Sequence, residues 1–150
     1  MLRKIVLGAL AGLATTLCTA TFANAQGTGA EAKAMLEKAV VAVKADKAKA
    51  IAMFNNGEGG FKDRDLYPFC FQLSDGIEVA APPSVRGKDV RTLKDPTGKA
   101  FGEELHKAGQ DEKISEVNYM FPKPGETTPV AKTSFVTKAS DLGCGVGYYK

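Results

Sequence analysis

The stretch Tyr67-Pro68-Phe69-Cys70-Phe71-Gln72-Leu73-Ser74-Asp75-Gly76 (residues 67–76) marks the point at which the hydrophobic pattern of the chain changes. Tyr67, Phe69 and Phe71 are separated by single residues, which is the pattern of a β-strand with one buried face. The Ser-Asp-Gly triplet is a turn signal, so residues 77–79 are expected to form a short return strand. Pro68 has no N–H for a sheet ladder, and we therefore place it at the start of the strand or at a bulge.

The segment before this hairpin has a helical pattern. Residues 30–54 are rich in alanine, lysine and glutamate, and their apolar residues recur at spacings near three and four. Thr28 and Glu31 fit a capping box at the start, and Gly57 is suited to the left-handed turn that ends a helix. Lys47 interrupts the apolar stripe, but the composition predicts one long amphipathic helix over about residues 29–55.

The segment after the hairpin predicts a short helix over 99–108 and three strands over 113–121, 130–138 and 142–149. The fold class is therefore α+β, with a sheet domain over about 61–150 and an antiparallel sheet of about five strands. In the last strand Gly143, Gly145 and Gly147 share one face. A phosphate-binding loop of the Walker type would require its motif lysine and a following helix, and both are missing after these glycines. We therefore interpret this face as a place where another element packs closely.

Residues 1–25 have the organisation of a secretory signal peptide. Arg3 and Lys4 precede an uncharged apolar stretch, and Ala23-Asn24-Ala25 offers a cleavage site before Gln26. A membrane anchor is the alternative, but several threonines dilute the apolar run. Lipid attachment at Cys18 is disfavoured because the residues before it are not small. We expect a single periplasmic or secreted domain over residues 26–150, with no membrane span after cleavage.

Charge and residue types exclude two classes of function. Of 20 basic residues two lie in the signal segment, which leaves 18 against 17 acidic residues in the remainder. A nearly neutral chain without basic clusters lacks the footprint of nucleic-acid binding. A single histidine, His106, and the absence of a nucleophile motif provide no catalytic constellation, so we expect no enzyme activity, no metal and no cofactor.

Export changes the interpretation of the cysteines. Cys70 and Cys144 remain after cleavage, and an even pair in an oxidising compartment is most simply a disulfide. Two buried free thiols are the first alternative. A catalytic or metal role is the second, although the chain has no CxxC motif.

A series of short motifs in a fixed order resembles a single Cache domain, the extracytoplasmic small-molecule sensor family of bacterial chemoreceptors and histidine kinases. The resemblance covers about residues 28–150. The motifs are Asp65-Leu66-Tyr67-Pro68-Phe69, Ser74-Asp75-Gly76, Arg86-Gly87-Lys88-Asp89, Leu93-Lys94-Asp95-Pro96-Thr97-Gly98-Lys99, Phe121-Pro122-Lys123-Pro124-Gly125, Lys132-Thr133-Ser134-Phe135-Val136 and Gly145-Val146-Gly147-Tyr148.

The resemblance implies a PAS-like fold in which a long N-terminal helix packs on one face of a five-stranded antiparallel sheet. Small carboxylates or amino-acid-like metabolites would bind on the other face, under the loop and the short helix. The first and last strands are neighbours in this family, which agrees with a Cys70–Cys144 disulfide. The family often has tryptophan where this chain has Phe121, and this chain has no tryptophan.

A carboxylate pocket requires a fixed cation, hydrogen-bond donors and aromatic walls. Lys132 is the candidate cation because it lies in the family's lysine motif, although a solvent-exposed position is the ordinary explanation for a mid-strand lysine. Ser134 lies on the same strand face and is a candidate donor. Tyr119 and Phe121 are equally suited to the pocket wall and to the core, and Tyr67 is more suited to the core.

Two further side chains belong to the candidate set with a weaker expectation. Arg86 is a candidate ligand clamp, but a loop-fixing ion pair with an acid such as Asp89 is the stronger alternative. His106 is expected at the surface.

The sequence therefore predicts an exported sensor-type binding domain for a small organic acid or amino acid. Because the chain ends at Lys150 without an output module, we expect signal transduction through a partner such as a membrane-bound receptor or kinase. The alternative is an interaction module that keeps the fold without a ligand.

Overall fold

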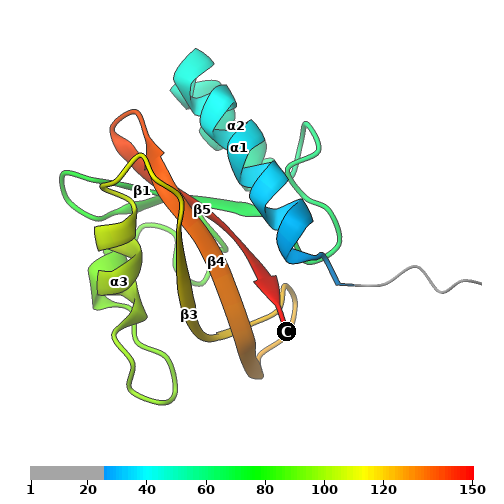
Figure 1. Cartoon of the computed structure of the whole chain (residues 1–150), viewed down its shortest axis with the longest axis vertical. Coiled ribbons are helices and arrows are strands. Elements are labelled where there is room, and N and C mark those ends of the chain that lie inside the picture. The colour runs from blue at the N-terminus through cyan, green and yellow to red at the C-terminus, as the bar shows by residue number, and fades with distance from the viewer. Residues whose placement is uncertain (1–25) are drawn as a thin grey trace, which may run out of the picture.

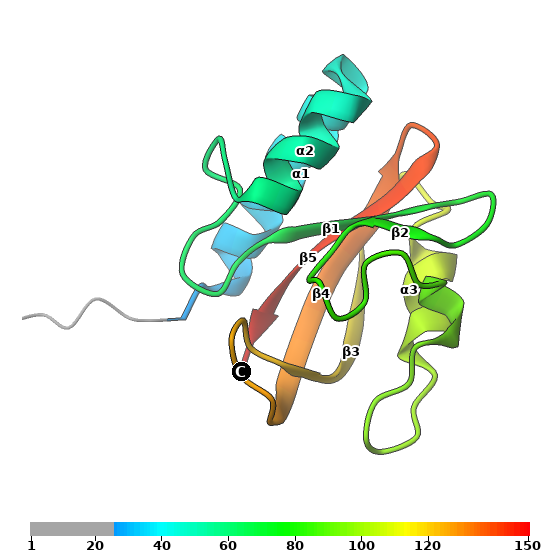
Figure 2. The same ribbon diagram turned by 180° about the vertical axis from the view of Figure 1, so that it is seen from behind.

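The computed structural model describes residues 26–150. The expected signal peptide, residues 1–25, lies outside the described residues. Two helices lie on one side of a sheet and a third helix lies on the other (Figures 1 and 2). Among residues 26–150, no helix combines the length and the apolar character needed to span a bilayer.

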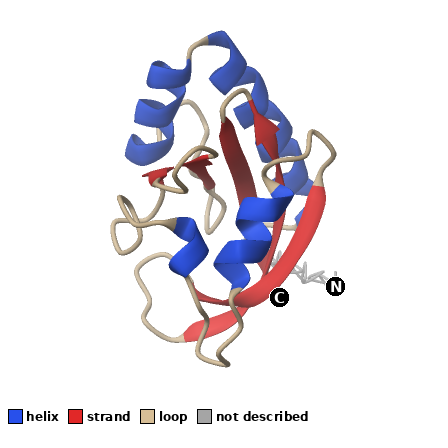
Figure 3. Cartoon of the chain, turned by 90° about the vertical axis from the view of Figure 1, so that its left-hand side faces the viewer, coloured by secondary structure: helices blue, strands red, loops and turns tan. Residues whose placement is uncertain are grey.

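The expected long helix is two helices, α1 (Gly29–Ala45) and α2 (Lys47–Asn56). The prediction of one continuous helix was wrong because Asp46 between them has extended backbone, with φ −157° and ψ 98°. Its carboxylate accepts a hydrogen bond from the Lys49 N–H at 3.0 Å and caps α2, so that the chain turns back on itself (Figure 3). Both outer ends are as expected, with the Thr28–Glu31 capping box and a left-handed Gly57.

The sheet has five antiparallel strands in the order β2-β1-β5-β4-β3. Their bounds are β1 (Pro68–Gln72), β2 (Glu78–Ala80), β3 (Ser115–Pro122), β4 (Pro129–Ala139) and β5 (Leu142–Tyr149). The α+β fold class and the pairing of the first and last strands are confirmed. Pro68 begins β1, as its missing N–H requires.

The Cys70–Cys144 disulfide joins β1 to β5. The two residues are direct partners in the strand register, with Cα atoms 4.1 Å apart. Both cysteines are fully buried in the core between the sheet and the two N-terminal helices, where they pack with Leu36, Val43 and Val146. The predicted disulfide is therefore confirmed.

The opposite face of the sheet is covered by the loop after β2, a 3₁₀ turn η1 (Val90–Thr92) and α3 (Phe101–Ala108). The glycine face of β5 lies here. A Cβ at Gly143 would collide with the Phe71 ring, and one at Gly145 would collide with the Phe69 ring. The close packing expected of this face is confirmed, and it brings the aromatic side chains of β1 down onto the strand backbone.

Candidate functional site

Lys132 lies in the middle of β4, opposite Tyr119 of β3 and Tyr149 of β5. Its side chain is 2% exposed, so the alternative of an ordinary surface lysine is excluded. The stem of the side chain crosses Gly147, where a Cβ would overlap Lys132 Cε. Glycine at this position is therefore what allows the lysine to lie flat against the sheet.

The ammonium group of Lys132 is surrounded by aromatic rings. Nζ lies 4.5 Å from the ring centroid of Tyr67, 4.9 Å from that of Tyr149 and 5.1 Å from that of Phe121. It donates a hydrogen bond to the Tyr67 hydroxyl oxygen at 2.8 Å. No carboxylate of residues 26–150 forms an ion pair with it. Three rings and one hydroxyl attract a cation, but they leave its charge without a counter-anion.

Burial lowers the pKa of Lys132 from 10.5 to about 7, because the charged form loses its hydration. The carboxyl groups of Asp65 and Glu78 act in the opposite direction. A carboxylate placed against Nζ would restore the charged form by direct attraction. The group is thus suited to binding an anion and taking up a proton as it does so.

Two buried carboxyl groups complete the surroundings of Lys132. Asp65 is 6% exposed, and its Oδ1 accepts a hydrogen bond from the Gly27 N–H at 2.6 Å, whereas Oδ2 has no partner. Glu78 is 3% exposed, and its Oε2 has no partner. Burial raises the pKa of Glu78 to about 8 against the opposing effect of Lys132. Sequence reasoning did not identify either residue as part of the site.

Tyr119 and Ser134 are brought together with Lys132 but are already engaged with each other. The Tyr119 hydroxyl and Ser134 Oγ form a hydrogen bond of 2.8 Å, and Ser134 is fully buried. The Tyr119 ring stacks on Phe101 of α3 at 4.3 Å between centroids. Desolvation raises the pKa of Tyr119 above its ordinary value. Both side chains therefore form the floor and wall beside Lys132.

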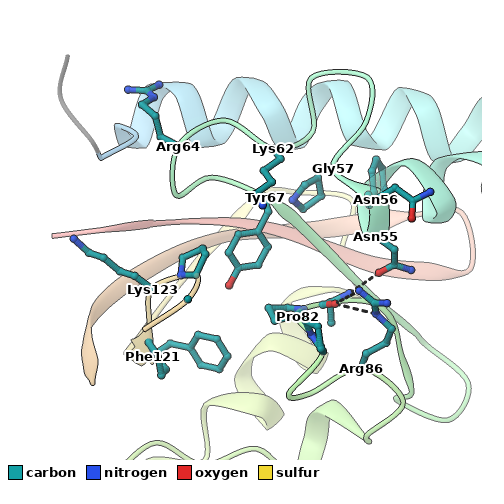
Figure 4. A pocket seen from close by; sticks show the side chains of 17 residues that line it. Asn55, Asn56, Gly57, Lys62, Arg64, Tyr67, Pro82, Arg86, Phe121 and Lys123 are labelled. Atoms are coloured by element: carbon teal, nitrogen blue, oxygen red, sulfur yellow. Dashed lines mark hydrogen bonds between the residues drawn. The ribbon is translucent and has the colours of Figure 1, made fainter. Parts of the chain in front are cut away.

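Two cavities meet at this point. The inner one, about 20 Å³, is lined by Lys132, Glu78 and Tyr119 among others, and has room for about one water molecule. The outer one, about 270 Å³, lies between α2, the loop after β2 and the β3–β4 loop. The two cavities share the residues Tyr67, Ala81, Pro82 and Phe121. In Figure 4 the Tyr67 ring projects into the outer cavity toward the side where Pro82 and Phe121 lie.

The outer cavity has a cationic lining. Lys62, Arg64, Arg86 and Lys123 contribute to it, and no Asp or Glu of the described chain does. The Arg64 guanidinium is itself paired with Glu31 at 2.7 Å and Asp63 at 3.0 Å. The remaining positive charge favours the approach of an anion toward the wall that separates the two cavities.

Arg86 does not form the ion pair with Asp89 that was the favoured expectation. Its Nε and Nη2 donate to the Ala81 carbonyl at 3.0 and 2.8 Å, and Asp89 pairs with Arg91 at 2.7 Å instead. Arg86 thus fixes the loop after β2 through a backbone carbonyl and lines the outer cavity (Figure 4).

His106 on α3 is half-buried and does not line either cavity. Its Nε2 lies 3.3 Å from the Leu73 carbonyl oxygen and its Nδ1 lies 3.2 Å from Gln110 Nε2. The imidazole is therefore less exposed than expected, and it lies away from the cluster around Lys132.

Comparison with known families shows to which family the chain belongs. The family model described as Single Cache domain 2 matches residues 18–149. The chain belongs to the single Cache domain family. In this Cache domain the Lys132 cluster lies on the sheet face away from the N-terminal helices, which is where the resemblance placed a pocket.

A curated relative of this Cache domain is the methyl-accepting chemotaxis protein McpP of Pseudomonas putida, with 34% identity over 67 residues. The match covers 45% of this chain and 12% of that protein, so the chain spans a small part of the receptor's length. The structure is also similar to a methyl-accepting chemotaxis protein from Vibrio parahaemolyticus, with a TM-score of 0.63 and 25% identity over 80% of this chain and 86% of that one.

Two further solved structures have the same fold. One, described as a Cache chemosensory domain that recognises carboxylic acids, has a TM-score of 0.65 at 24% identity and covers 80% of this chain and 91% of its own. The other, a periplasmic sensor domain of a chemotaxis protein, has a TM-score of 0.61 at 25% identity and covers 80% and 88%. The relatives are sensor domains of chemotaxis receptors.

Proposed function

We propose that this Cache domain is an extracytoplasmic sensor module that binds a small carboxylate through the Lys132 ammonium. The observation that carries the proposal is a buried lysine with no counter-anion, held in an aromatic cage at the boundary of two cavities. A buried charge is expensive unless it is paired, so an anionic ligand is the partner that the cage lacks.

The inner cavity is smaller than any organic acid, and the ligand therefore requires movement of the shared wall. Tyr67 and Phe121 are the two large side chains in that wall. Rotation of either ring would join the inner cavity to the cationic outer one. The carboxylate would then replace the Tyr67 hydroxyl as the hydrogen-bond partner of Nζ.

The small inner volume also bears on the alternative of an interaction module without a ligand. A pocket that no longer binds a ligand is expected to be filled by apolar side chains that pack against one another, with no unpartnered polar group left inside. Here two unpartnered carboxyl oxygens and an unpaired ammonium remain buried, which favours a site that binds a polar ligand. Signalling to a membrane-bound receptor or kinase is part of the same proposal and rests on the receptors among its relatives.

Thermal unfolding of the purified protein with acetate, propionate, lactate and alanine tests the proposal. A ligand at 100 times its Kd stabilises the fold by about 2.7 kcal/mol. Lys132→Met is expected to weaken binding at least about 100-fold, because truncating one side of a buried ion pair costs about 3–5 kcal/mol. Lys33→Met is the matched control, since it removes one charge from the exposed side of α1. Unchanged affinity in Lys132→Met, or no response to any acid, would contradict the proposal.

A further inference from the structure

Glu78 is held rigidly at the inner cavity by its own backbone. Its N–H donates to the Lys88 carbonyl at 2.9 Å and its carbonyl accepts from the Gly87 N–H at 2.8 Å, while its register partner in β1 is Phe71. These bonds fix the backbone of Glu78, and its side chain lines the cavity together with Lys132. It is 3% exposed, so water outside the protein does not satisfy it.

The carboxyl of Glu78 and the ammonium of Lys132 face one cavity without forming an ion pair. A carboxyl and an amine that were free to meet would normally form a direct hydrogen bond, because the contact would satisfy both groups. Their separation leaves Oε2 as an acceptor without a donor. Buried acceptors in folded proteins are almost always bonded, and an exception at a cavity points to a missing partner.

We propose that Glu78 is a specificity-determining residue that accepts a hydrogen bond from a hydroxyl or ammonium group on the carbon next to the ligand's carboxylate. This inference rests on the proposed function, since it requires the carboxylate to bind Lys132. A 2-hydroxy or 2-amino acid presents an acceptor and a donor on adjacent carbons. It can therefore bridge Lys132 and Glu78, whereas an unsubstituted acid leaves Oε2 unsatisfied.

Lactate, alanine and propionate test this selectivity because they share one carbon skeleton and differ in the substituent next to the carboxylate. Calorimetric titration of the purified protein is expected to show that lactate or alanine binds at least about 10-fold more tightly than propionate, because only the substituted acids can donate a hydrogen bond to Glu78. Equal or tighter binding of propionate would overturn the proposal. That result is expected if Glu78 instead donates its own proton to the carboxylate.

Two variants of Glu78 test whether it accepts a hydrogen bond from the ligand and whether the ligand's donor is a hydroxyl or an ammonium group. Glu78→Met removes the acceptor and is expected to abolish the preference over propionate; a preference that survives in this variant overturns the proposal. Glu78→Gln keeps an acceptor without charge, so it preserves a preference for lactate and removes one for alanine. Both variants replace a buried acid by a neutral side chain, and both are expected to fold.

The two proposals fail in different ways. If Lys132→Met leaves binding unchanged, the proposed function is wrong whatever Glu78 does. If Lys132→Met abolishes binding but propionate binds as well as lactate and alanine, the role of Glu78 alone is wrong. A protein that binds none of the three acids contradicts both.

Discussion

Replacement of Glu78 by glutamine is expected to stabilise the protein, and the gain should grow with pH. The native state holds this carboxyl in its neutral form, because burial raises its pKa from 4.5 to about 8. The unfolded chain ionises it near the ordinary value. Between the two values the unfolded state therefore binds fewer protons than the native state, and stability falls as pH rises through this window.

The size of the effect follows from the same two values. Each pH unit between 4.5 and about 8 removes about 1.4 kcal/mol of stability, which gives an upper limit of about 5 kcal/mol above pH 8. Glutamine does not titrate, so the variant avoids this loss. We expect the two proteins to have similar stability below about pH 4.5, and the variant to be more stable by about 2–5 kcal/mol near pH 8.

Urea unfolding of both proteins across this pH range measures the difference directly. Lys132 faces Glu78 across the cavity and each group shifts the pKa of the other, so the measured difference includes the change that the substitution makes in the titration of Lys132. Glu116→Gln on the exposed face of β3 is the matched control, and its difference from the native protein should stay small at every pH. A constant difference between the Glu78→Gln and native proteins from pH 4.5 to 8 would refute the reasoning.

Three further variants test the fold and the site. Replacing Cys70 and Cys144 by alanine removes a link across 74 positions and is expected to lower the unfolding free energy by about 4 kcal/mol in denaturant titrations; a loss under about 1 kcal/mol would contradict the chain-entropy account. Gly147→Ala places a methyl group against the Lys132 stem, so carboxylate affinity measured by calorimetry should fall at least about 10-fold, and unaltered affinity would show that Lys132 does not need this glycine. Thr28→Ala removes the cap of α1 and should cost about 1 kcal/mol in thermal unfolding, with no change indicating that the cap is dispensable.

Most of the sheet could be predicted from local patterns, because alternation and turn residues act over a few positions. The bounds of β5 agree with the expectation for 142–149, and its glycine face was recognised as a packing surface. The break at Asp46 could not be predicted in the same way. The residues around it are good helix formers, and the interruption of the apolar stripe at Lys47 was the available signal.

The site was harder to predict because burial there depends on register. Alternation alone predicts that Ile77 and Val79 face the core and Glu78 faces solvent, but the register shifts between Cys70 and Phe71, and Glu78 pairs with Phe71 and is buried as well. Tyr149 lies on the same face of β5 as the three glycines, which alternation along the strand predicts. Its approach to Lys132, however, depends on the pairing of β5 with β4. A contact between side chains of three different strands cannot be recognised from the residue pattern of any single strand.

The glycines of β5 also have a practical consequence for protein engineering. They let the Phe69 ring and the Lys132 stem lie directly on the backbone of β5 and form the base of the cavity, while its sides come from the segment after β2, from α3 and from Phe121. The disulfide lies behind this base, on the opposite face of the sheet. A library confined to the sides could therefore retune which metabolite is detected, on a braced scaffold that tolerates the losses in stability that such changes bring.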